Sequence, residues 1–130
     1  MILAVKLAMT LATLCFAIGY AARRRDNRLH RRVMLLGFAV TLAAAAILVA
    51  GVQGFGATYR PVYWLVRGTG GPEHARWVLM AHRAVAALTF AAIGTQVYSG
   101  IRRHPLHVRL YPYTIGLWLV TYVSGMLIFA

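Results

Sequence analysis

Two histidines stand directly before long apolar stretches, where an imidazole could ligate a metal or a haem iron. His30 lies in the segment LHRRVM and His107 in the segment HPLHVRLYP. In an up-and-down helix bundle both positions reach the same depth, and a bis-histidine haem b takes one ligand on each face of its ring. The spacing therefore predicts a haem site with His30 and His107 as axial ligands. The same positions also suit polar residues that only meet the membrane surface, so both interpretations stay open.

Two further side chains could join this site. Met34 follows His30 by one helical turn on the same face, which makes it a candidate axial or copper ligand. His104 precedes Pro105, a residue suited to the first position of a helix, so His104 is expected to cap that helix and is a further candidate haem ligand. Small residues that would leave room for a flat ring follow Met34 in the same stretch: Gly37, Ala39 and the alanines at 43–46.

A second set of candidate ligands lies near the start of the third apolar stretch. His82 is about five residues inside it, and an ionisable side chain within a membrane span is costly enough to mark a functional candidate. His74 lies two turns earlier, beside Glu73, and could join His82 in a metal site. The alternative for His82 is a hydrogen bond to a neighbouring helix, and for His74 a solvated helix start.

The remaining composition excludes several kinds of chemistry. Asp26 and Glu73 are the only acidic residues, which rules out catalysis by paired carboxylates. Cys15 is the only cysteine, so an intramolecular disulfide framework and a cysteine-based zinc or iron–sulfur site are excluded. No pattern resembles an activated nucleophile, so we expect no catalytic residue and an electron carrier or assembly factor rather than an enzyme.

The elements that must position the histidines are membrane helices. Hydrophobic residues make up 61% of the 130 residues and charged residues 12%, about half the charged share of a soluble domain. Four apolar stretches, each near the roughly 20 residues that cross a bilayer, are expected to be helices at 2–22, 33–52, 77–101 and 110–130. The first is too long for a signal peptide and its basic residues follow it, so we expect it to be retained.

Basic residues predict the orientation of these helices. Nine arginines lie in 23–32 and 102–109, which should face the cytoplasm by the positive-inside rule. The predicted fold is therefore an all-α, integral membrane, up-down four-helix bundle over residues 1–130, with both termini and the 53–76 loop on the outer side. The glycines and prolines of that loop are expected to keep it non-helical and close to the membrane. The net charge of +12 then indicates contact with lipid headgroups rather than nucleic acid.

Three segments resemble the CtaM-like family, small bacterial membrane proteins linked to maturation of haem–copper terminal oxidases. They are LHRRVM, LMAHRAVAAL and HVRLYPYTIGLWLVTYVSGMLIF, and the glycines of VQGFGATYRPVYW fit as well. The resemblance spans about residues 27–129 and extends to transmembrane b-type cytochromes. It implies that His30, His82 and His107 are haem or metal ligands. One outer histidine of the family pattern is absent, because this chain has Val52 and Gln53 there.

Together these observations predict a protein of the bacterial inner membrane that binds haem b, or copper, through histidines. Its expected role is terminal-oxidase assembly or transmembrane electron transfer in the respiratory chain. The expected partners are the lipid bilayer, a haem–copper oxidase or other respiratory complex, and a second copy that could complete the site at His82. The alternative is a non-catalytic structural or interaction subunit of a larger membrane complex.

Overall fold

The computed structural model describes residues 2–54 and 71–128, which form four helices and two short turns. The helices are α1 (Ile2–Ala22), α2 (Asn27–Gly54), α4 (Gly71–Ile101) and α5 (Leu106–Ile128). The predicted all-α class is confirmed. Among residues 2–54 and 71–128, three helices, α1, α2 and α4, are long and apolar enough to cross a membrane, whereas four were expected. Helix α5 has 23 residues, which corresponds to a rise of about 35 Å, and it contains Pro112.

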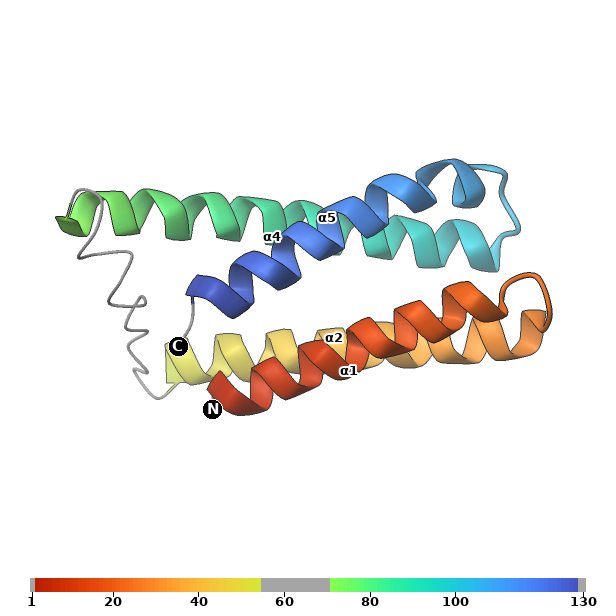
Figure 1. The fold of residues 1–130 in the computed structure, drawn as a ribbon, viewed down its shortest axis with the longest axis horizontal. Coiled ribbons are helices and arrows are strands. Elements are labelled where there is room, and N and C mark those ends of the chain that lie inside the picture. The colour runs from red at the N-terminus through yellow and green to blue at the C-terminus, as the bar shows by residue number, and fades with distance from the viewer. Residues whose placement is uncertain (1, 55–70, 129–130) are drawn as a thin grey trace. The chain divides into compact units, whose positions relative to one another are not determined.

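The helices pair into two compact units (Figure 1). In one unit α1 packs along α2, and in the other α4 packs along α5. Each pair is antiparallel, because a turn of a few residues joins its two helices. The up-and-down order that the sequence predicts is therefore present within each pair.

Small residues line the contact between α1 and α2. The buried positions of α1 recur every three or four residues and are Ala12, Cys15, Gly19 and Ala22. A Cβ added at Gly37 of α2 would lie 2.8 Å from the ring of Phe16 and 3.1 Å from the Cβ of Cys15. Large apolar residues of α1 instead face outward: Leu3, Leu7, Leu11, Leu14 and Ile18. Small residues inside and large apolar residues outside are typical of helices that pack in lipid.

Helix α2 begins six residues earlier than the sequence predicts. Asp26 caps it, because the Asp26 Oδ1 accepts the backbone N–H groups of Arg28 at 2.8 Å and Leu29 at 2.9 Å. This is the ordinary use of an aspartate before the first helical residue. Arginine is itself a good helix former, so the basic segment that resembled a loop is the first turns of α2.

Helix α4 also begins earlier than predicted, at Gly71 instead of Trp77. Pro72 is its second residue, where the missing N–H has no intrahelical partner to lose. The expectation that Pro72 breaks the helix was therefore wrong, and residues 71–76 are helical rather than part of a loop. The remainder of the predicted outer element, 55–70, lies outside the described residues.

Candidate cofactor site

His107 is held against α4 by two reciprocal hydrogen bonds with Gln96. The His107 Nδ1 donates to the Gln96 backbone oxygen over 2.9 Å, and the Gln96 Nε2 donates to the His107 backbone oxygen over 2.7 Å. Gly100 makes room for the imidazole, since a Cβ there would lie 2.9 Å from two of its ring atoms. His107 thus lies in the first turn of α5, as predicted, with its ring fixed in orientation.

Gln96 is almost fully buried, with 4% of its surface exposed. Its Oε1 is buried and accepts no hydrogen bond within the described part of the chain. Exchanging the amide oxygen and nitrogen would turn Oε1 toward the His107 carbonyl, where two acceptors would repel. The amide orientation therefore follows from the bond to His107. Gln96 thus connects α4 to α5.

His30 has an equivalent arrangement in the other unit. Its Nδ1 lies 2.7 Å from the backbone oxygen of Gly19, on the neighbouring helix α1. A Cβ at Gly19 would lie 2.7 Å from the Met34 Sδ, so Met34 covers the same glycine. The prediction that His30 and Met34 share a face of α2 is confirmed, and that face is turned toward α1.

His82 is held by a hydroxyl rather than by a carbonyl. Its Nδ1 lies 2.8 Å from the Ser124 Oγ, and the Ser124 hydroxyl donates to the Val120 carbonyl over 2.6 Å. Because that proton is used within α5, the Ser124 Oγ accepts the Nδ1–H of His82. Gly125 lies under the ring, with a hypothetical Cβ 3.4 Å from the His82 Cε1. The hydrogen bond to a neighbouring helix, proposed from sequence as the alternative role, is therefore present.

The three contacts have a common chemical consequence. A carbonyl oxygen only accepts, and the Ser124 hydroxyl has already donated its proton, so Nδ1 carries the proton in His30, His82 and His107. In the neutral imidazole the lone pair is then on Nε2. Histidines that ligate metals show this arrangement, with the second ring nitrogen donating to a carbonyl or another fixed acceptor.

His104 has the opposite arrangement. Its Nδ1 accepts the backbone N–H of Leu106 over 3.2 Å, which confirms the predicted cap of α5. In the neutral ring the proton is then on Nε2, so ligation through Nε2 would require that proton to leave. His104 as a haem ligand remains a prediction.

His74 and His82 are not gathered into a cluster. His74 is exposed on α4, whereas His82 turns toward α5. Within residues 2–54 and 71–128, no group of three or more histidine, cysteine, aspartate or glutamate side chains could hold a metal ion. The side chain of Glu73 lies outside the described residues. The metal site at His74 and His82 stays a prediction, as does the role of Met34 as a metal ligand beside His30.

The distance along α5 separates His82 from His107. Ser124, the partner of His82, lies 17 positions after His107, which is about 25 Å along α5. His82 and His107 therefore belong to different sites at opposite ends of the unit.

Gly37 does not offer room for a flat ring, contrary to the prediction, because Phe16 of α1 lies over it.

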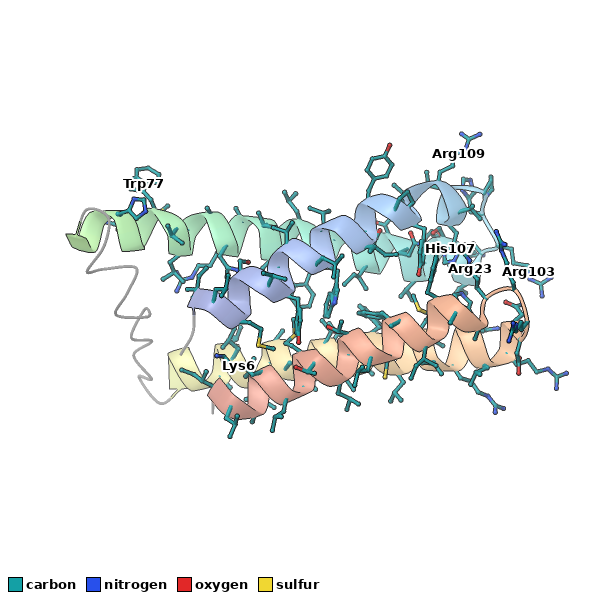
Figure 2. All side chains as sticks on the ribbon, in the orientation of Figure 1. Lys6, Arg23, Trp77, Arg103, His107 and Arg109 are labelled. Carbon is teal, nitrogen blue, oxygen red and sulfur yellow. The ribbon has the colours of Figure 1, made fainter. Side chains whose placement is uncertain are left out.

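Charged and aromatic side chains also separate the two ends of the α4–α5 unit. Figure 2 shows His107 at the end that carries Arg103 and Arg109, with Trp77 near the other end. Arg103 and Arg109 are exposed. His107 thus lies at the same end of the unit as two exposed guanidinium groups, and guanidiniums bind carboxylates with paired hydrogen bonds.

Sequence reasoning missed the partners of the three histidines: Gly19, Gly100, Gln96 as the specific partner of His107, and Ser124 as that of His82. Small and polar residues at helical spacing were visible, but their pairing depends on the register between helices. No family model, curated protein or solved structure matches this chain.

Proposed function

We propose that this protein binds haem b through histidines, with His30 and His107 as ligands, and serves terminal-oxidase assembly or electron transfer in the bacterial inner membrane. The observation that supports the proposal is the shared fixed orientation of the histidines, each with Nδ1–H donated to an acceptor on a neighbouring helix. Such an acceptor orients the ring and makes Nε2 a better ligand. Copper at the same imidazoles is the less favoured form of the proposal.

The residues present fit a haem in their chemistry. Two neutral imidazoles with Nε2 lone pairs are the donor set that a six-coordinate b-type haem uses, and the bound iron would carry one electron. The protein's own contribution is orientation: Gln96 and Gly100 fix the ring of His107, while Gly19 fixes that of His30. Arg109 offers an exposed guanidinium that suits a propionate.

The proposed membrane location and the proposed role in oxidase maturation have separate support. Three helices long and apolar enough to span a bilayer support a membrane protein. The resemblance of the segments around His30, His82 and His107 supports a role in oxidase maturation. An assembly factor would release its haem or metal, whereas an electron carrier would retain it.

A second function is favoured by the same contacts. Gly100 and Gly125 are covered by imidazoles, so the histidines also hold the helix pairs together as packing residues. A structural subunit of a larger membrane complex would need the histidines only for this packing, without a bound cofactor. Its exposed alanines on α2, among them Ala39 and Ala43, would then meet partner helices.

The visible spectrum of the purified protein in detergent, before and after dithionite, distinguishes the two functions. A bis-histidine haem gives a sharp reduced α-band, which His30→Ala and His107→Ala should each abolish. In this proposal His104 is not an axial ligand, so His104→Ala, which removes the cap of α5, should keep the band. A protein that stays colourless after haem addition would contradict haem binding, and copper titration would then test the metal form.

Loss of the band through unfolding must be separated from loss of a ligand. Helix content by circular dichroism should be unchanged in His107→Gly, and added imidazole should restore the band by occupying the space left by the side chain. A folded His107→Gly variant whose band resembles the wild type without imidazole would show that His107 is not a ligand.

A further inference from the structure

Three arginines form one face at the start of α2. Arg28, Arg31 and Arg32 have the spacing that brings side chains together on a helix, and all three are exposed. His30 points the other way, since its ring is bonded to Gly19 of α1. The arginine face therefore points away from α1.

The charge of this segment is not neutralised within the described part of the protein. Residues 23–32 hold six arginines and one acid, Asp26, whose Oδ1 already accepts two backbone N–H groups. The guanidinium of Arg23 stacks on the Tyr20 ring, 3.8 Å from its centroid. The other arginines have no ion pair or ring contact within residues 2–54 and 71–128: Arg24, Arg25, Arg28, Arg31 and Arg32. Several guanidiniums are thus available to an external anion.

The same face becomes apolar one turn further along α2. Leu35 and Leu36 each follow an arginine of the face by four positions, and both are exposed. Ala39 and Ala43 continue the face and are exposed as well. The ligand that matches this surface has an anionic end followed by a hydrocarbon part.

The position of the arginines along α2 matches the depth of the lipid headgroups. Residues 27–32 rise about 9 Å before the continuous apolar segment begins at Val33. The polar layer on each side of a bilayer is about 5–8 Å thick. The guanidiniums therefore lie at the depth of lipid phosphates if α2 spans the membrane.

We propose that this face of α2 binds an anionic phospholipid, with its phosphate at Arg28, Arg31 and Arg32 and the start of its acyl chain along Leu35 and Leu36. Guanidiniums recognise phosphate oxygens through paired, charge-assisted hydrogen bonds. A soluble phosphate or an acidic peptide would use the arginines but would leave the leucines uncovered. The proposal does not depend on haem or copper binding.

Lipid binding to the full-length protein in detergent tests this site. Fluorescent phosphatidylglycerol, which is anionic, and fluorescent phosphatidylcholine, which has no net charge, are titrated in parallel. The triple variant Arg28→Gln, Arg31→Gln, Arg32→Gln should bind phosphatidylglycerol on the order of a hundredfold more weakly, because each of the three guanidiniums at the phosphate contributes about a fivefold preference for the anionic lipid. Its affinity for phosphatidylcholine should not change.

The other turn provides a matched control. Arg102→Gln, Arg103→Gln, Arg109→Gln removes the same number of charges from α5 and the turn before it, and should change phosphatidylglycerol affinity less than threefold. An equal loss in both triple variants would overturn the proposal, because total charge would then explain binding. Glutamine keeps helix propensity, and circular dichroism of each variant checks the fold.

A third comparison separates a lipid from a soluble anion. Leu35→Ser, Leu36→Ser should weaken phosphatidylglycerol binding at least tenfold while all arginines remain. Glycerol phosphate should compete only at millimolar concentration. Tight binding of glycerol phosphate, or an unchanged lipid affinity in the serine variant, would contradict a site that recognises both parts of a phospholipid.

Discussion

At the scale of single residues, the position of the proton on each imidazole decides which ring nitrogen has the lone pair that a metal or haem iron would need. His30 and His107 donate Nδ1–H to backbone carbonyls, and His104 accepts through the same atom. Identical side chains thus have opposite tautomers because their nearest backbone groups differ. No sequence pattern contains this information, since the Gln96 carbonyl reaches His107 only after the two helices have paired.

Arg103 has a backbone conformation that favours glycine. Its φ is 53°, and it follows α4 at the position where helices commonly end in a left-handed residue. The accompanying bonds are present: the His104 N–H donates to the Ser99 oxygen over 2.8 Å, and the Arg103 N–H to the Gly100 oxygen over 3.2 Å. A side chain at this position costs free energy that glycine does not.

Arg103→Gly should therefore stabilise the protein by up to about 1 kcal/mol. The measurement is thermal unfolding in detergent, followed by circular dichroism. Arg102→Gly is the control and should destabilise, because it places glycine at the end of α4 with no positive φ to relieve. A lower melting temperature in Arg103→Gly than in the wild type would contradict the prediction.

At the scale of helix pairs, the two units use different interactions. Small residues and the His30 imidazole bring α1 and α2 together, whereas hydroxyls, an amide and two imidazoles connect α4 to α5. Thr89 is a central example: its hydroxyl donates to the Val85 carbonyl of its own helix over 2.8 Å, and its Oγ1 lies 2.7 Å from the Thr121 Oγ1 of α5. Thr95, by contrast, donates its hydroxyl to the Ala91 carbonyl of its own helix over 2.8 Å.

The glycines of α4 offer a test of the interface that holds His107. Gly100→Ala would place a Cβ 2.9 Å from the imidazole, whereas Gly94→Ala meets nothing within 4 Å. Gly100→Ala should destabilise by about 1–3 kcal/mol through overpacking. Gly94→Ala should be neutral or stabilise by up to about 1 kcal/mol, since alanine favours helix.

Chemical unfolding of both variants in mixed micelles measures this difference. The Gly100→Ala variant should also lose the fixed orientation of His107, which changes the imidazole signal in an NMR spectrum. Equal stability of the two alanine variants would show that the contact between His107 and Gly100 is not tight.

Helix ends mark the limit of what the sequence predicts. The bounds of the first helix, 2–22, were correct, because an apolar run followed by three arginines defines them. The starts of α2 and α4 were placed six residues too late, since polar residues and Pro72 were taken as loop. Hydrophobicity indicates which residues of a helix lie in lipid, whereas capping residues such as Asp26 indicate where the helix begins.

At the scale of the whole molecule, positive charge gathers at the turn of each helix pair. Arginines lie at 23–32 in one unit and at 102, 103 and 109 in the other. If the helices span a membrane, the positive-inside rule places both turns in the cytoplasm and both termini outside.

Reporter fusions test this orientation. A phosphatase that folds only outside the cytoplasm should be active when fused after Ala130, and inactive when inserted in the turn at 102–105. The reverse result would contradict the predicted topology. Changing Arg24, Arg25, Arg28, Arg31 and Arg32 to glutamine should increase the fraction of inverted molecules, because the charge difference between the two sides falls.

The buried Cys15 gives the α1–α2 contact an intrinsic reporter. It is the chain's single thiol, with its Cβ against Gly37. An alkylating reagent small enough to enter detergent micelles can reach Cys15 only when α1 separates from α2. The rate of alkylation therefore measures how often α1 separates from α2, and it does so without an engineered label. Conditions or ligands that close the pair will slow the reaction, and those that separate the helices will speed it.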